Sequence, residues 1–278
     1  MDIDKLIREE LTKRGIDVEI EEVEVIKNTV RCKGIKIINY HSTNVYPIIY
    51  YNQEETISAI ADKIVAVVTS ELPTFDISEI LSKDFFTLNA YICCDRHDST
   101  ISDVVSKQFL NLDIIIKLRV MADSDGICSI KITKFLLEII GLSPDKAFTI
   151  AMNNSRKTVT IKTMADIIGT SDDISDCPMH VLSCNQGHGG ASAIVFTDVL
   201  RNWCMANDLT EVFILPSSTE EMILVSENTI TTDKLLEINK NITSSIVNPV
   251  LSLDPAVYYY STTSNIVTIA AAEVIDDD

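Results

Sequence analysis

The spacing of apolar residues predicts a helix at the start of the chain and a strand pair after it. Apolar residues recur at intervals of three and four between Ile3 and Leu11, which places them on one face of a helix. Gly15 is a residue type that commonly ends helices. Apolar and polar positions partly alternate from Val18 to Val25 and again from Val30 to Ile37. We therefore predict two antiparallel strands joined by a turn at Asn28.

Two further elements follow in the first third of the chain. Residues Val45–Tyr51 form a short apolar segment that is typical of a strand, and Pro47 within it favours an edge position or a strand start because proline cannot donate to a ladder. From about Glu54 to Ser70 the apolar residues return to helical spacing. Pro73 closes this region.

The middle of the chain holds three apolar segments, Phe85–Cys94, Leu112–Met121 and Ile127–Ile132. The last two flank Asp123-Ser124-Asp125-Gly126, which is typical of a hairpin loop. Ser143-Pro144-Asp145 then predicts the start of a helix, because it offers a capping hydroxyl, proline at the first position and an acid near the positive end of the helix dipole.

The last third of the chain has the clearest pattern. Met179–Cys184 predicts a strand, Asn185–Gly190 a loop, and Ala191–Met205 a helix. Further predicted elements are strands at 211–215 and 221–225, a helix at 232–242, and closing strands at 256–260 and 266–270. The order of these elements predicts an α+β fold with mixed, mostly antiparallel sheets and packed helices.

The length of 278 residues exceeds the usual ~100–200 residues per domain. Thr170–Asp176 is polar and acidic and is the best candidate for a linker. We therefore predict an N-terminal α+β domain at 1–170 and a C-terminal α+β domain at 178–278, with a single domain as the alternative.

Charge narrows the classes of partner. The chain has 23 Lys and Arg against 41 Asp and Glu, a net charge of −18, so its mean surface repels phosphate backbones and anionic membranes. Direct nucleic-acid binding is therefore disfavoured. The simplest role of the negative charge is to keep the protein soluble. The more specific alternative is that the protein is an acidic decoy that occupies a nucleic-acid-binding protein.

Other features favour a cytoplasmic location. No apolar run reaches the ~18–20 residues of a membrane span, and the charged, amphipathic N-terminus does not resemble a signal peptide. Seven cysteines, an odd number with irregular spacing, favour reduced thiols.

The candidate ligand site is the loop that joins the predicted strand at 179–184 to the helix after it. Bare backbone amides at such a junction can bind an anion, but the spacing matches neither the P-loop nor the dinucleotide fingerprint. The alternative is that small residues let the helix pack tightly on its strand. The candidate ligand-binding residues are Gly187, His188, Gly189, Gly190 and Ser192 of the loop, with Ser217, Ser218 and Glu220 of the following turn.

Catalytic and metal sites are weaker hypotheses. His188-Gly189-Gly190 resembles the oxyanion loop of lipases, but the chain lacks a Gly-x-Ser-x-Gly elbow, and without a positioned base Ser217 and Ser218 are ordinary turn residues. Zinc-compatible residue types occur at Cys177, His180, Cys184 and His188. On a strand, however, His180 and Cys184 would lie about 13 Å apart, too far to share a metal.

The run from Met179 to Val225 resembles an uncharacterised bacterial family found mainly in gut Firmicutes and their mobile elements. Lys27-Asn28, Pro47–Tyr51, Ala147–Asn154 and Tyr258–Tyr260 fit the same pattern in order, so the resemblance covers nearly the whole chain. The resemblance implies that the chain shares the fold of this family, and it implies no mechanism because the family has no established activity. In that family a histidine follows the Pro-Ser-Ser segment, and Thr219-Glu220 occupies its place here.

No complete catalytic motif is present, so the expected function is a non-catalytic cytoplasmic binding or regulatory protein with a macromolecular partner. The sequence does not identify the partner, for which a protein is one candidate, and no cofactor is expected. An enzyme or a small-anion or nucleotide binder that uses the loop 185–192 is the alternative.

Overall fold

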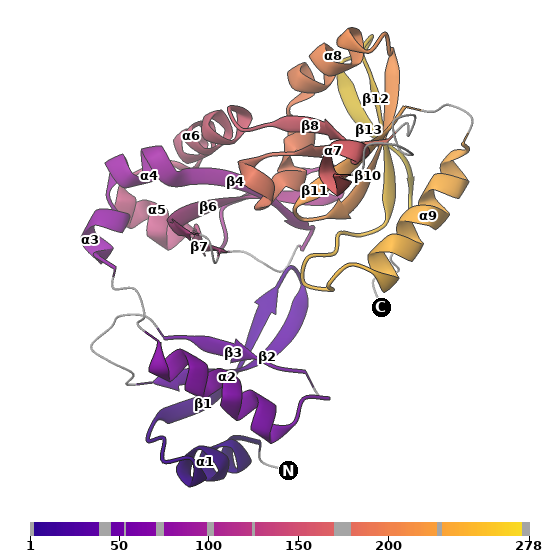
Figure 1. Cartoon of the computed structure of the whole chain (residues 1–278). Coiled ribbons are helices and arrows are strands. Elements are labelled where there is room, and N and C mark those ends of the chain that lie inside the picture. The colour runs from indigo at the N-terminus through magenta and orange to yellow at the C-terminus, as the bar shows by residue number, and fades with distance from the viewer. Residues whose placement is uncertain are drawn as a thin grey trace. The chain divides into compact units, whose positions relative to one another are not determined.

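The computed structural model confirms the predicted α+β class (Figure 1). Within the described residues, three sheets contain antiparallel pairs throughout, with helices packed on them. None of the described helices has the length and apolar composition needed to cross a membrane. The structure describes residues 3–38, 46–52, 54–70, 75–98, 103–123, 126–169, 179–226 and 230–273.

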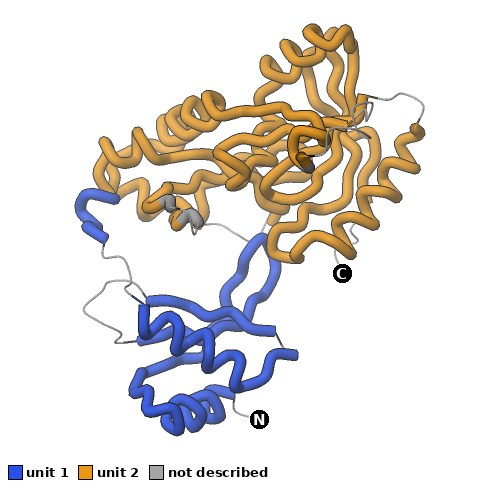
Figure 2. Tube along the Cα trace, viewed as in Figure 1, with its two compact units in different colours: residues 1–80 blue, residues 81–278 orange. Residues whose placement is uncertain are grey.

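The chain divides into two compact units, unit 1 at Met1–Ile80 and unit 2 at Leu81–Asp278 (Figure 2). The boundary predicted at 170–178 falls on residues outside the described part of the chain. The strands on either side of it, β8 (Thr160–Thr163) and β9 (Met179–Ser183), pair with each other in one sheet. The boundary between the two compact units lies after Ile80, whereas the boundary between the predicted domains lies at 170–178.

Unit 1 is a two-layer arrangement of helices on a small sheet. The sheet has the order β1-β2-β3, and the turn between its first two strands contains Asn28 and Thr29, as predicted. The elements are α1 (Ile3–Lys13), β1 (Glu19–Lys27), β2 (Val30–Ile38), β3 (Ile48–Tyr50), α2 (Ile57–Thr69) and α3 (Ile77–Ile80).

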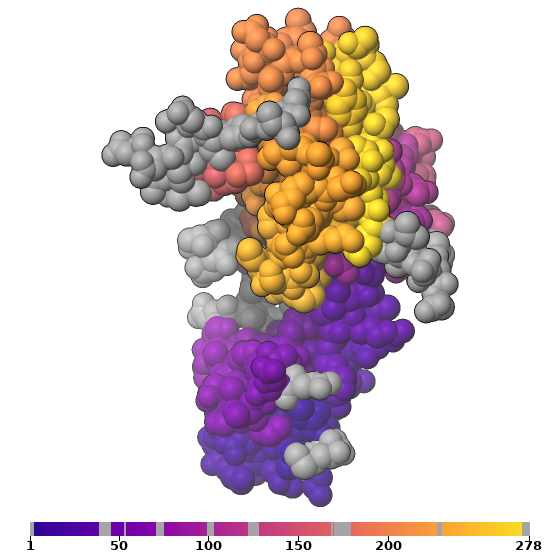
Figure 3. All heavy atoms as spheres, turned by 90° about the vertical axis from the view of Figure 1, so that its right-hand side faces the viewer, coloured from indigo at the N-terminus to yellow at the C-terminus, as the bar shows by residue number. Residues whose placement is uncertain are grey.

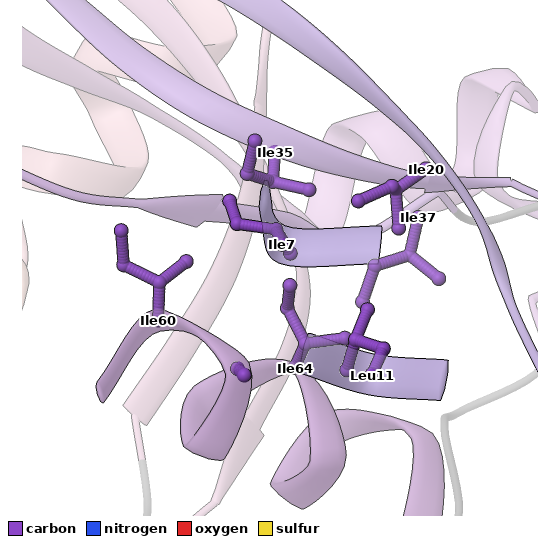
Figure 4. Close-up of a cluster of buried hydrophobic side chains, with 8 residues drawn as sticks. Ile7, Leu11, Ile20, Ile35, Ile37, Ile60 and Ile64 are labelled. Atoms are coloured by element: carbon purple, nitrogen blue, oxygen red, sulfur yellow. The ribbon is translucent and has the colours of Figure 1, made fainter. Parts of the chain in front are cut away.

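The core of unit 1 lies between its helices and its sheet. Figure 4 shows the apolar side chains of α1 and α2 directed toward those of β1 and β2. Burial of this face explains the helical spacing seen in the sequence, because each helix presents one apolar stripe to the sheet. The buried residues are Ile7, Leu11, Ile20, Ile35, Ile37, Ile60, Ala61 and Ile64.

Unit 2 begins with a small sheet around β6 (Leu112–Asp123). β4 (Ala90–Arg96) pairs along one side of β6, and β5 (Ser106–Phe109) and β7 (Gly126–Lys131) pair in succession along the other. The apolar segment Phe85–Cys94 is divided between a helix and β4. The helices of this part are α4 (Lys83–Asn89), α5 (Lys134–Ile140) and α6 (Pro144–Arg156).

A six-stranded sheet with the order β13-β12-β10-β11-β9-β8 forms the rest of unit 2. Side chains alternate between its faces. Val257 packs with Leu235 of α9 (Thr232–Ser245) on one face, whereas the Tyr260 hydroxyl on the other face donates to the carbonyl of Thr197 in α8 (Thr197–Ala206). The remaining strands are β10 (Glu211–Ser218), β11 (Glu221–Val225), β12 (Ala256–Ser261) and β13 (Ile266–Ala272).

The helix predicted at Ala191–Met205 is two elements. A 3-10 helix, η2 (Gly190–Val195), precedes α8, and the helical backbone is interrupted at Phe196, whose ψ is 70°. A tertiary contact holds the first element, because the Ala191 amide donates to the carbonyl of Thr219 in the turn between β10 and β11.

Candidate functional site

The loop after β9 has an unusual backbone. Asn185, Gln186 and Gly187, which form the 3-10 turn η1 (Asn185–Gly187), have φ angles of 55°, 60° and 91° in succession. Residues other than glycine adopt this left-handed conformation at an energetic cost that surrounding contacts must offset. The contacts of this loop therefore show what it is built to do.

Side chains of the loop hold the free edge of β4. The Asn185 side-chain amide donates to the Ile92 carbonyl at 3.0 Å, and the Ser192 hydroxyl donates to the same oxygen at 3.1 Å. The Ile92 amide donates to the Ser155 hydroxyl of α6 at 3.0 Å. Because buried backbone groups need partners, these bonds satisfy the edge of the small sheet and join it to the six-stranded sheet.

Two glycines of the loop stand where no side chain fits. A Cβ on Gly189 would lie 2.8 Å from Cys93 Cβ, and a Cβ on Gly190 would overlap the Ser183 hydroxyl and the Glu220 carbonyl oxygen. Both glycines are buried. They let the loop pass between the two sheets at close range.

Four backbone amides of the loop donate to carbonyls within the fold. Those of Gly187, His188, Ala191 and Ser192 donate to protein carbonyls at 2.9, 3.3, 3.2 and 3.2 Å. An anion cradle needs amides that are free to donate to a ligand. The contacts of the loop therefore favour tight packing over anion binding at this junction.

The turn between β10 and β11 meets the loop through backbone atoms. The Glu220 carbonyl accepts from the Ser183 hydroxyl at 2.8 Å, and the Glu220 amide donates to the Ser218 hydroxyl at 3.1 Å. The Ser217 hydroxyl donates to Glu221 at 3.3 Å. These are turn-stabilising contacts, and they link Ser217 and Ser218 to no histidine.

The thiols near the loop are poor nucleophiles. Burial raises the pKa of Cys184 to about 11 and that of Cys93 to about 12, so both stay protonated near neutral pH. Burial lowers the pKa of His180, whose ring lies 5.0 Å from Trp203. Of the residues with zinc-compatible side chains, Cys177 lies outside the described residues, and the described residues contain no cluster of three or more His, Cys, Asp or Glu able to hold a metal.

Two hollows border the loop. One, of about 400 Å³, is lined by Gln186 and Gly187 together with Lys162 and Glu221. It carries charges of both signs, and four of its nine lining residues belong to β8 and β9. The candidate residue Gly187 therefore lines a surface hollow. Gln186, which lines the same hollow, was not among the predicted site residues.

The second hollow, which we call the Arg119 pocket, has a volume of about 440 Å³ and lies between the ends of α4 and α6 and the strands β4 and β6. The residues that define it are Asn89, Tyr91, Arg119, Asn154, Lys157 and Asn185. Sequence reasoning missed this pocket. The available signal was Lys117 and Arg119, two residues apart in the otherwise apolar stretch Ile114–Met121, a spacing that puts both on one face of a strand.

Comparison with known proteins gives a family and no activity. A family model described as a family of unknown function (DUF5688) matches residues 2–262. Neither a curated protein nor a solved structure matches the chain.

Proposed function

The chain belongs to DUF5688, a family of unknown function, and from its own geometry we propose that it is a non-catalytic binding protein whose partner is another protein. Among the described residues β13 pairs with β12 alone, and its other, free edge carries this proposal. An unpaired edge strand presents backbone donors and acceptors on which an extended segment of another protein can form a further strand.

The edge at β13 is apolar and accessible. Its sequence, IVTIAAA, contains no charge and no proline. Ile266 is 56% exposed and Ile269 is 41% exposed. Figure 3 shows the C-terminal strands, in yellow, as part of the molecular surface. Proteins usually protect such edges with charge, proline or short length, and β13 has none of these protections.

Two other edges of the described sheets, β1 and β8, are protected. β1 carries four glutamates, and β8 has four residues that include Lys162. β13 contains one irregularity, an extra residue at Ala270 in its pairing with β12. Because a bulge disturbs pairing locally, the stretch Ile266–Ile269 is the part suited to strand addition.

The charge of the chain suggests the kind of partner. With a net charge of −18, the protein attracts positively charged proteins at long range. We propose a basic protein with an extended apolar segment as the partner. The buried, protonated thiols and the backbone-bonded serines support a binding role without catalysis, and the odd number of cysteines supports the reducing cytoplasm as its location.

The proposal is tested by capture from native cells with tagged full-length protein. Ile269→Lys adds a charge to the edge strand and is expected to weaken capture about tenfold or more, since charged edges resist pairing. The matched control is Met205→Lys, which adds the same charge at a residue of α8 that is 64% exposed.

The expected result is a partner that wild-type protein and Met205→Lys retain and Ile269→Lys loses. The proposal is wrong if wild-type protein captures no partner, or if both lysine variants capture it equally. Self-association of the wild-type chain that Ile269→Lys abolishes would identify a second copy as the occupant instead.

A further inference from the structure

The charges of the Arg119 pocket set it apart from two other hollows in the described part of unit 2. Arg119 and Lys157 line it, and no aspartate or glutamate does. A third hollow contains Arg96 and Lys240, and there each cation meets a carboxylate, Asp254 at 3.3 Å and Glu273 at 3.0 Å. In a chain with 41 acidic residues, a pocket with two cations and no acid points to an anion from outside the protein.

Arg119 lacks the partners that a half-buried guanidinium needs. Its Nε is buried and has no hydrogen-bond partner among the described residues, and no ion pair to Arg119 is formed there. Its guanidinium carbon lies 5.3 Å from the centre of the Tyr91 ring, which holds the group over an aromatic face. A partly buried charge without a counterion is costly, so a bound anion would relieve that cost.

The rest of the pocket fits a small polar ligand. Lys157 stands at the end of α6, where a cation also meets the helix dipole favourably. That effect does not explain Arg119, which comes from β6. The Asn154 amide donates to the carbonyls of Thr87 and Ala90 at 2.9 Å each, so the nearby backbone is satisfied and the two cations remain for a ligand. A volume of about 440 Å³ lies within the range of small-molecule sites.

We propose that the Arg119 pocket binds a small anion through a carboxylate or phosphate group. The guanidinium of Arg119 provides the planar donor fork that both groups accept, and Lys157 adds a second positive charge at the rim. The pocket shares only Asn185 with the loop 185–192, four of whose amides donate to carbonyls within the fold, and it does not depend on the edge at β13.

Binding is measured by calorimetry and thermal shift on the full chain, with inorganic phosphate and malonate as separate probes. At least one probe is expected to bind saturably and to raise the melting temperature. Arg119→Gln is expected to weaken binding about tenfold or more, on the scale of charge-assisted hydrogen bonds. Arg119→Lys keeps the charge but loses the fork, so its affinity should fall between those of wild type and Arg119→Gln.

Two surface variants keep the test decisive if substitution of Arg119 impairs folding. Lys157→Gln removes an exposed cation of the pocket and is expected to weaken binding, whereas Lys146→Gln removes an exposed cation of the same helix that does not line it. Preference for one probe identifies the chemical group. Saturable binding of neither probe, or equal binding by wild type and Lys157→Gln, would overturn the proposal.

Discussion

Gly190 has no room for a side chain, and its replacement tests the packing role of the loop. In Gly190→Ala the new Cβ would overlap a hydroxyl of Ser183 and the backbone oxygen of Glu220. Because backbone cannot move aside as a flexible side chain does, we expect the free energy of unfolding to fall by about 3 kcal/mol or more. Chemical denaturation of the full chain measures this change.

Gly187→Ala is the matched control. Gly187 has a φ of 91°, and a Cβ added there would meet no atom within 4 Å, so we expect a loss of about 1 kcal/mol from backbone strain alone. If both variants lose the same free energy of unfolding, steric crowding is not the reason that position 190 requires glycine.

For single residues, the sequence indicates which positions need a small side chain, but it does not indicate which distant residues pack against them. The run of small residues at 187–192 predicts a close approach, and the structure has one. The contacts that Gly190 makes come from Ser183 and Glu220, the second of which lies thirty positions further along the chain. The Arg119 pocket combines residues of five separate elements, α4, β4, β6, α6 and η1. Periodicity reports local spacing, so it cannot bring such distant residues together.

One buried polar side chain, that of Asn239, joins α9 to its sheet by hydrogen bonds. Asn239 is 1% exposed, donates to the Pro216 carbonyl at 2.7 Å and accepts from the Ala256 amide at 3.1 Å. Asn239→Leu would leave both backbone groups without these partners, at an expected cost of about 2–4 kcal/mol. The control, Asn241→Leu, changes an exposed residue of the same helix. Thermal unfolding that is unchanged in Asn239→Leu would contradict this role.

Helices and strands with regularly spaced apolar residues could be predicted from the sequence. Elements whose conformation depends on tertiary contacts could not. The apolar stripe at 57–69 fits a helix packed on one face, and α2 is that helix. Phe85–Cys94 is mostly apolar along its whole length, so its composition does not reveal where α4 ends and β4 begins. At Ala191–Met205 the spacing predicts one helix, but the bond from Ala191 to Thr219 favours a 3-10 segment before α8.

The division of the whole molecule is the hardest feature to predict from composition. The polar stretch Thr170–Asp176 indicates a linker, yet connections between paired strands are polar for the same reason, because they too face water. The strands before and after it pair within one sheet. Each unit instead has its own buried clusters: the one at Ile7–Ile64 belongs to unit 1 alone, and the one that contains Leu215 and Val257 belongs to unit 2 alone.

Separate cores predict that damage to one unit leaves the other intact. Ile64 is fully buried in unit 1, and Ile64→Ala is expected to destabilise that unit by about 2–5 kcal/mol through lost burial and a cavity. Hydrogen exchange followed by mass spectrometry should show faster exchange in α1 and α2 and unchanged protection in β10 and β12. Leu224→Ala, at a fully buried position of β11, should give the reverse pattern. Cores that unfold independently do not affect each other's hydrogen-exchange protection. If either substitution lowers protection equally in both units, the prediction is wrong and the two cores unfold as one cooperative structure.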